Sequence, residues 1–163
     1  MFSFLKKKES PVANNHLYAV AKGTLIPITE VNDPVFSQKM MGDGFAVLPE
    51  NGTIFSPIEG EIISVFQTKH AVGMKTASGI EVLLHMGVDT VELNGAPFSI
   101  HVHEGDKVTK DTQIASVDLE AIKAAGKATD MIVVITNMDK VKAVELTKTG
   151  LVSPVEEVGH VEL

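Results

Sequence analysis

Hydrophobic residues in this sequence fall into short runs, several of which alternate with polar residues. The clearest runs are residues 17–20, 44–48, 61–66, 71–75, 80–84, 113–117 and 131–136. Turn-forming residues separate them at Gly52, Gly60, Ser78-Gly79, Asn94-Gly95 and Gly105-Asp106. Many short strands with this spacing are typical of an all-β sandwich or barrel.

Two short helices are predicted between the strands. Asp33 can cap the first, with Pro34 at its first position, and this helix runs toward Met40. Asp118 can cap a second helix over residues 119–125, which Gly126 ends. No repeat or interdomain linker interrupts the pattern. We therefore expect a flexible leader over residues 1–16 and a single domain over residues 17–163.

Composition excludes several classes of function. With 44% hydrophobic and 21% charged residues, the chain is an ordinary globular protein. Cysteine is absent, which excludes disulfides, thiolate metal sites and a thiol nucleophile. A net charge of −7 argues against general nucleic-acid binding. The first eight residues, MFSFLKKK, form a solubilising tail in our interpretation, with weak contact to an anionic membrane surface as the alternative.

The most informative feature is a predicted β-hairpin that carries two histidines. A turn at Ala77-Ser78-Gly79 separates two strand-like runs, with His70 before it and His85 after it. If the loop has two residues, both imidazoles point to one face, with Cβ atoms about 5 Å or about 7 Å apart depending on the register. A three-residue loop would place them on opposite faces.

Two adjacent imidazoles suit phosphoryl transfer. A neutral ring nitrogen is nucleophilic near pH 7, because the unperturbed pKa of histidine is about 6.5. The second imidazole can donate a hydrogen bond to the phosphoryl oxygens, and Gly87 lets backbone amides approach them. Taken alone, however, two histidines in strands favour a metal pair or hydrogen-bonded interior histidines over phosphotransfer.

The wider sequence decides between these alternatives, because it resembles the glucose-family IIA component of the bacterial phosphoenolpyruvate-dependent sugar phosphotransferase system. The segments that carry the resemblance are residues 33–36, 39–44, 68–71, 84–93 and 135–139. The resemblance covers nearly the whole chain after the leader. It implies an antiparallel β-sandwich of the barrel-sandwich type, with the two histidines in a shallow depression ringed by apolar residues.

The resemblance also implies a role for each residue of the site. His85 matches the phosphorylated histidine, and His70 matches the partner that stabilises the phosphoryl group. Thr68 and Asp89 match the polar positions that support the two rings. Apolar positions of the family's partner-binding face are matched by Phe36, Met40, Met41, Phe66 and Val91. The alternative for these five is core packing or scattered surface positions, and for Phe36 and the two methionines we favour the docking face.

By the same resemblance, the chain is a cytoplasmic phosphotransferase component. It would accept a phosphoryl group from the histidine phosphocarrier protein and donate it to a cysteine of a IIB domain on a separate transporter. No metal or organic cofactor is expected. Two alternatives are a regulatory binding protein of the same fold that lacks phosphotransfer, and a biotinyl or lipoyl carrier domain modified at Lys75, which precedes the hairpin turn. Members of the family also bind regulatory protein partners.

The remaining histidines and carboxylates are assigned no catalytic role. His101 and His103 would share one face if residues 99–103 form a strand, but no third metal ligand is placed by spacing, so we expect surface histidines. Glu92 is expected to be a solvated carboxylate or a residue that selects basic partners near His85.

Overall fold

The computed structural model describes residues 15–163, and strands dominate it. The largest sheet is antiparallel and has eight strands, in the order β10 (Lys107–Val108), β6 (Gly60–Val65), β7 (Ala71–Lys75), β8 (Glu81–Val88), β12 (Ala128–Ile135), β4 (Asp43–Pro49), β3 (Gly23–Pro27) and β14 (Gly150–Val152). Two smaller antiparallel sheets are β5 (Thr53–Phe55), β11 (Gln113–Val117) and β9 (Phe98–Ile100), and β13 (Ala143–Leu146), β15 (Glu157–Glu162) and β2 (His16–Tyr18).

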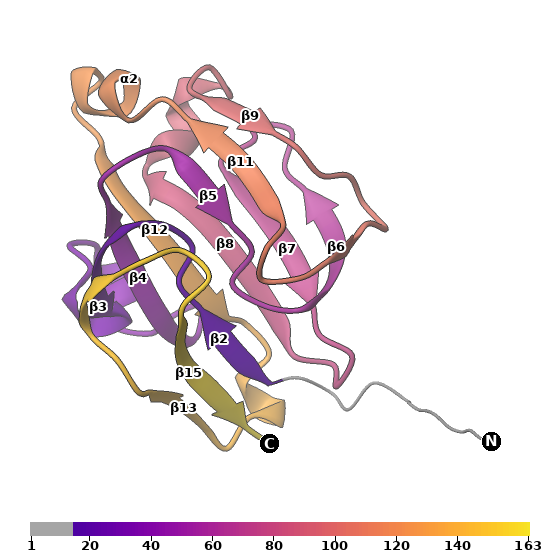
Figure 1. The fold of residues 1–163 in the computed structure, drawn as a ribbon. Helices are drawn as coiled ribbons and strands as arrows, with labels where there is room; N and C mark the ends of the chain where they lie inside the picture. The colour runs from indigo at the N-terminus through magenta and orange to yellow at the C-terminus, as the bar shows by residue number, and fades with distance from the viewer. Residues whose placement is uncertain (1–14) are drawn as a thin grey trace.

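The small sheets lie over one face of the large one, as the expected sandwich requires. Figure 1 shows β5, β11 and β2 in front of β8, β12 and β4. Alternate side chains of β8 make this packing possible: Val82, Leu84 and Met86 are buried in the main core, whereas Glu81, Leu83 and His85 are only partly buried on the other face. The all-β antiparallel sandwich is thus confirmed, with two short α-helices.

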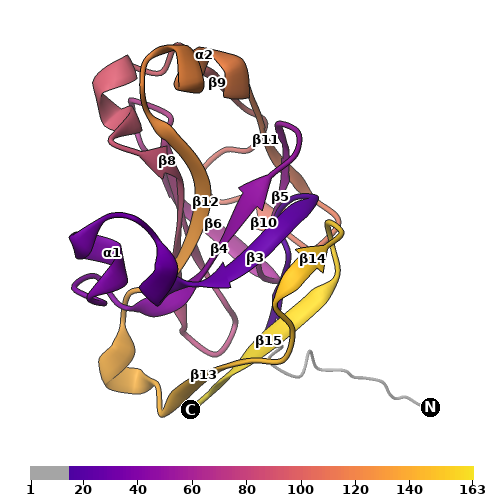
Figure 2. The ribbon, with the colours of Figure 1, turned by 90° about the vertical axis from the view of Figure 1, so that its left-hand side faces the viewer.

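A second, smaller apolar cluster covers part of the outer face. The 3₁₀ helix η1 (Ile28–Glu30) and helix α1 (Pro34–Ser37) bury Ile28, Val31 and Phe36 with Ala46 and Ile132. Figure 2 shows α1 on the opposite side of β4 and β12 from β14 and β15. The cross-strand register places Ala71, His85, Ile132 and Ala46 in one row, so His85 lies at the edge of this covered patch.

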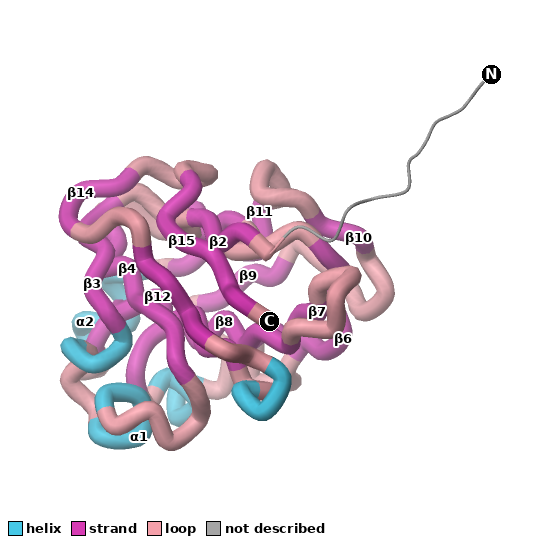
Figure 3. Tube along the Cα trace, turned by 90° about the horizontal axis from the view of Figure 1, so that it is seen from below, coloured by secondary structure: helices cyan, strands magenta, loops and turns pink. Residues whose placement is uncertain are grey.

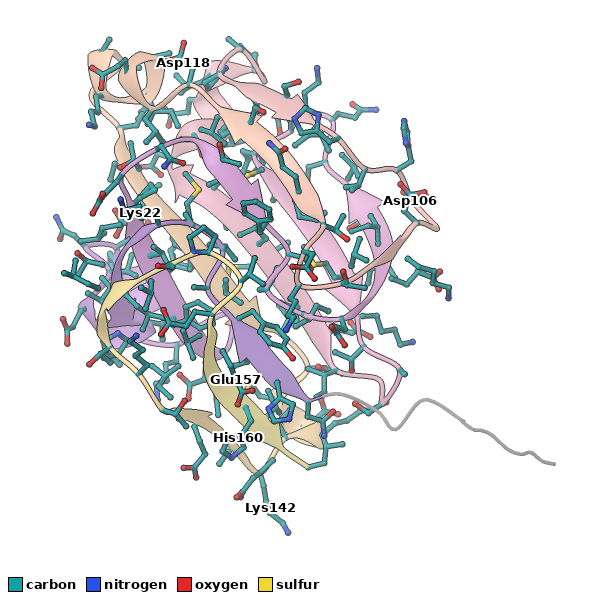
Figure 4. All side chains as sticks on the ribbon, viewed as in Figure 1. Lys22, Asp106, Asp118, Lys142, Glu157 and His160 are labelled. Carbon is teal, nitrogen blue, oxygen red and sulfur yellow. The ribbon has the colours of Figure 1, made fainter. Side chains whose placement is uncertain are left out.

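The two predicted helices are present, and their caps are as expected. The Asp33 carboxylate accepts from the Val35 N–H at 2.9 Å, but α1 ends before Met40 because Lys39 takes a left-handed φ of 58°. The Asp118 carboxylate accepts from the Ala121 N–H at 3.1 Å and starts α2 (Leu119–Ala124), and Gly126 follows with φ 76°. Figure 4 shows Asp118 where β11 passes into α2.

The described part of the chain begins beside its C-terminal strand. The Val161 N–H donates to the Asn15 carbonyl at 2.9 Å, and Figure 3 shows β2 alongside β15. His16, the last residue expected in the leader, already belongs to β2, and residues 1–14 lie outside the described residues. Within residues 15–163, no helix is long and apolar enough to cross a membrane.

Candidate functional site

The β7–β8 hairpin, which carries the candidate site, closes with a longer loop than predicted. Ala71 pairs with His85 and Lys75 with Glu81, and the Thr76 N–H donates to the Ile80 carbonyl at 2.9 Å. The loop therefore spans residues 77–79, and both two-residue loops considered from the sequence are wrong. Asn137 holds this register: its Nδ2 donates to the Gly79 carbonyl at 2.8 Å and its Oδ1 accepts from the Glu81 N–H at 2.8 Å.

The two imidazoles nevertheless lie side by side. The ring centroids of His70 and His85 are 4.9 Å apart, with an interplanar angle of 80°. The three-residue loop does not separate them, because His70 lies in a bend before β7 and not in the strand itself. Lys69 has a left-handed φ of 59°, and its N–H donates to the Phe66 carbonyl at 2.8 Å. The adjacency is confirmed, but a turn produces it, not strand alternation.

The tautomer of His85 follows from its partner. His85 Nδ1 lies 2.7 Å from the Gly87 carbonyl oxygen, which can only accept a hydrogen bond. We therefore assign the proton of the neutral ring to Nδ1, which leaves a lone pair on Nε2. Sequence reasoning singled out Gly87 because it lets backbone amides approach a phosphoryl group, and the structure adds that its carbonyl bonds His85.

His70 is held by the residue that the sequence indicated. His70 as a whole is only 6% exposed, and its Nδ1 lies 2.7 Å from Thr68 Oγ1. Burial lowers the pKa of His70. Burial also lowers the pKa of His85, although the hydrogen bond to Gly87 and the negative charges of Asp33 and Asp89 oppose that shift. Burial therefore favours the neutral, nucleophilic form of both imidazoles.

Asp89 acts on His85 through its charge. It adopts a left-handed φ of 60° at the start of the 3₁₀ helix η2 (Thr90–Leu93). In the described part of the chain, its carboxylate hydrogen-bonds neither imidazole, so its influence on His85 is electrostatic. Asp33, to which sequence reasoning gave no role at the histidine pair, adds a second negative charge near His85.

Two phenylalanines flank the histidine pair. The Phe36 ring lies 5.1 Å from that of His85, and the Phe66 ring lies 5.4 Å from that of His70. Phe36 is only 5% exposed, because it packs in the cluster beneath α1, so it offers a partner little surface, contrary to expectation. The other four predicted docking residues are exposed: Met40, Met41, Phe66 and Val91.

The other candidate residues lie in ordinary surroundings. Lys127 Nζ donates to Glu92 Oε1 at 2.6 Å, so Glu92 is ion-paired. β9 ends at Ile100, and His101 and His103 contact Ser116 and Asp106 separately. Among the residues described, no three histidine or carboxylate side chains are grouped to hold a metal. Lys75 pairs with Glu81 at the end of β7 and does not lie at the hairpin tip.

Sequence reasoning missed one buried polar residue beside the site. The Thr90 hydroxyl donates to the Met86 carbonyl at 2.6 Å, and Thr90 is fully buried. The available signal was the spacing, because a threonine hydroxyl commonly bonds a carbonyl four residues earlier.

Comparison with known proteins places this geometry in a family. Residues 15–141 match the family described as phosphoenolpyruvate-dependent sugar phosphotransferase system, EIIA 1. The glucose-specific EIIA component of Halalkalibacterium halodurans is 45% identical over 89% of this chain and 86% of its own length. The glucose-specific EIICBA component of Streptococcus pneumoniae is 52% identical over 90% of this chain, which spans only 20% of that protein. The glucose permease IIA of Mycoplasma capricolum has a similar structure, with a TM-score of 0.81 and 35% identity over 98% of both chains.

Proposed function

The chain belongs to the EIIA 1 family of the phosphoenolpyruvate-dependent sugar phosphotransferase system, and we propose that it carries the phosphoryl group on Nε2 of His85. A member of this family is a phosphocarrier in sugar transport and a component of a phosphotransferase. The observation that supports the proposed atom is the 2.7 Å contact between His85 Nδ1 and the Gly87 carbonyl, which leaves Nε2 as the free nucleophile.

The proposed step exchanges one nitrogen–phosphorus bond for another. The Nε2 lone pair of His85 attacks the phosphorus of a phosphorylated histidine on the donor protein. The nitrogen–phosphorus bond of the donor breaks, and its electron pair returns to the donor imidazole. Such transfers depend on positioning and on stabilisation of the phosphoryl charge. The fixed tautomer and the lowered pKa of His85 supply an oriented, neutral nucleophile.

His70 and Thr68 are assigned to the phosphoryl oxygens. If the Thr68 hydroxyl donates to His70 Nδ1, at 2.7 Å, the Nε2–H of His70 is left to donate to a phosphoryl oxygen. The 4.9 Å between the ring centroids keeps that donor next to His85. A preorganised donor of this kind lowers the energy of a charged transition state.

The partners are assigned by the same logic. Met40, Met41, Phe66 and Val91 are exposed, and Phe66 lies against His70; adaptable apolar side chains suit a surface that meets more than one protein. We assign the histidine phosphocarrier protein as donor and a cysteine of a IIB domain as acceptor. A cytoplasmic site for both transfers and additional regulatory partners stay predictions.

The test is phosphorylation of the purified chain by phosphoenolpyruvate, the general first enzyme and the histidine phosphocarrier protein, with His85→Ala alongside. Acid-labile, alkali-stable label on the wild type alone is the expected result. Label on both proteins would move the acceptor to another residue, His70 first. No label on either, with a known IIA protein labelled in parallel, would support the regulatory binder in place of the phosphocarrier.

A further inference from the structure

One backbone hydrogen bond is missing where the β7–β8 ladder ends. The Met86 N–H donates to the His70 carbonyl at 2.7 Å. In a regular antiparallel pair the two residues exchange both bonds. Across the described residues, the return bond from the His70 N–H to the Met86 carbonyl is not formed, because the chain has already turned at Lys69. Met86 is fully buried, and a buried carbonyl without a hydrogen-bond partner is destabilising.

The Thr90 hydroxyl takes the place of the missing donor. It lies 2.6 Å from the Met86 carbonyl oxygen, and Thr90 is itself 0% exposed. The left-handed turn at Asp89 brings Thr90 back over the end of β8. The Thr90 hydroxyl therefore donates to the Met86 carbonyl in place of the His70 N–H, which lies outside the ladder because His70 is positioned beside His85.

The methyl group of Thr90 lies close to Gly87, the residue that follows Met86. A Cβ on Gly87 would lie 2.4 Å from Thr90 Cγ2 and 3.0 Å from the Ala128 carbonyl oxygen, and the φ of Gly87 is +89°. Only glycine fits this position without displacement. The Gly87 carbonyl is the acceptor for His85 Nδ1–H, so Thr90 bonds the Met86 carbonyl and lies against the α-carbon of Gly87, the residue that carries this acceptor.

We propose that Thr90 is a positioning residue for phosphoryl transfer, which sets the tautomer and orientation of His85 through the Met86–Gly87 backbone. The proposal rests on the proposed function of His85. Thr90 does not touch the phosphoryl group. Its hydroxyl anchors the Met86 carbonyl, its methyl packs beneath Gly87, and the Gly87 carbonyl then holds the proton on Nδ1.

Two variants distinguish the contribution of the Thr90 hydroxyl from that of its methyl group. Thr90→Val keeps the shape and removes the hydroxyl, whereas Thr90→Ser keeps the hydroxyl and removes the methyl. We expect Thr90→Val to slow phosphoryl acceptance about 10- to 100-fold and Thr90→Ser to slow it less than about threefold, because small misplacements of a nucleophile are costly. The ¹⁵N shifts of His85 report the tautomer directly, and we expect a mixed tautomer in Thr90→Val alone.

The outcomes distinguish this proposal from the proposed function. A wild type that takes no label would overturn the phosphocarrier role, while the ¹⁵N shifts would still decide whether Thr90 sets the tautomer. Wild-type shifts together with near-wild-type acceptance in Thr90→Val would overturn the positioning role. Equal losses in Thr90→Val and Thr90→Ser, matched by equal falls in urea midpoint, would assign Thr90 to packing only and also overturn it.

Discussion

At the two ends of the β7–β8 hairpin, different side chains bond the backbone groups that the ladder leaves unpaired. At the tip, residues 77–79 leave the ladder, and Asn137 bonds the backbone groups of Gly79 and Glu81 where the loop passes into β8. At the base, the ladder ends one bond early, and Thr90 satisfies the Met86 carbonyl. The tip uses the side chains of Thr76 and of Asn137, which is 58 residues from Gly79, whereas the base uses Thr90, four residues from Met86.

The difference between the two ends indicates why the histidine pair lies at the base of the hairpin. At the tip, the Ile80 N–H bonds the Thr76 hydroxyl and Asn137 bonds the loop, at the other end of the hairpin from the histidine pair. At the base, the bond from the His70 N–H to the Met86 carbonyl is absent, and the His70 and His85 rings contact each other. We therefore expect changes at the tip to affect stability, and changes at the base to affect transfer as well.

The largest effect is expected from Gly87→Ala. The new Cβ would meet Thr90 Cγ2 at 2.4 Å, and the φ of +89° strains any other residue. We expect a loss of about 2–4 kcal/mol in the free energy of unfolding. Displacement of the Gly87 carbonyl should also slow phosphoryl acceptance at least about 100-fold. Urea unfolding and a rapid-quench assay of label measure the two losses.

Gly79→Ala at the tip is the matched control. Gly79 has a similar φ of +94°, but nothing lies within 4 Å of the position that a Cβ would take there. We expect a cost of about 1–2 kcal/mol from backbone strain alone and unchanged transfer. Equal losses of transfer in the two variants would contradict the division between tip and base.

The next effect in size is expected from His70→Ala. The nucleophile His85 keeps its hydrogen bond to Gly87, so the variant should still accept a phosphoryl group. Without the His70 donor, onward transfer to the IIB domain should slow about 100-fold. Label chase to a IIB domain measures this step. Normal onward transfer by His70→Ala would remove His70 from the mechanism, and His101→Ala, which alters an exposed histidine bonded to Ser116, is the control.

The sequence was sufficient for those parts of the fold that depend on neighbouring residues. The strands at residues 71–75 and 113–117 and the Asp118 cap were predicted from local pattern and are present. The hairpin loop was predicted wrongly, because its length depends on Asn137, which no local pattern connects to Gly79.

In the site, too, features that depend on distant residues could not be predicted from local sequence. Contact between His70 and His85 was predicted, but from strand alternation, whereas the left-handed Lys69 produces it. Burial of Phe36 depends on how η1 and α1 fold over Ala46 and Ile132, which periodicity within a four-residue helix cannot reveal. Strands β13 to β15 were not predicted, because glycine and charged residues interrupt their apolar positions.

A smaller effect, confined to stability, is expected from Asn137→Ala. Removal of the amide leaves the Gly79 carbonyl and the Glu81 N–H without their partner, at a cost of about 1–2 kcal/mol. Asn137→Asp keeps the acceptor for Glu81 and should lose roughly half as much. Phosphoryl acceptance should stay within about twofold of wild type in both. A larger loss of acceptance would show that the tip positions His85.

The smallest effect is expected from mild acidification, and it again separates base from tip. Burial lowers the pKa of both His70 and His85, so the folded protein binds fewer protons than the unfolded chain just below pH 6.5. The stability that these two groups contribute is therefore complete above pH 6.5 and falls as the pH drops through the lowered pKa values.

The rate of phosphoryl acceptance should change only slightly over the same range. The neutral fraction of a free imidazole falls about threefold between pH 7 and pH 6, so acceptance should fall by less than about threefold. Rates of acceptance across this range, with Asn137→Asp as a tip variant, test the prediction. A fall steeper than about threefold would mean that His85 is protonated more readily than its burial implies. A profile for Asn137→Asp that matches wild type would locate the titration at the base of the hairpin.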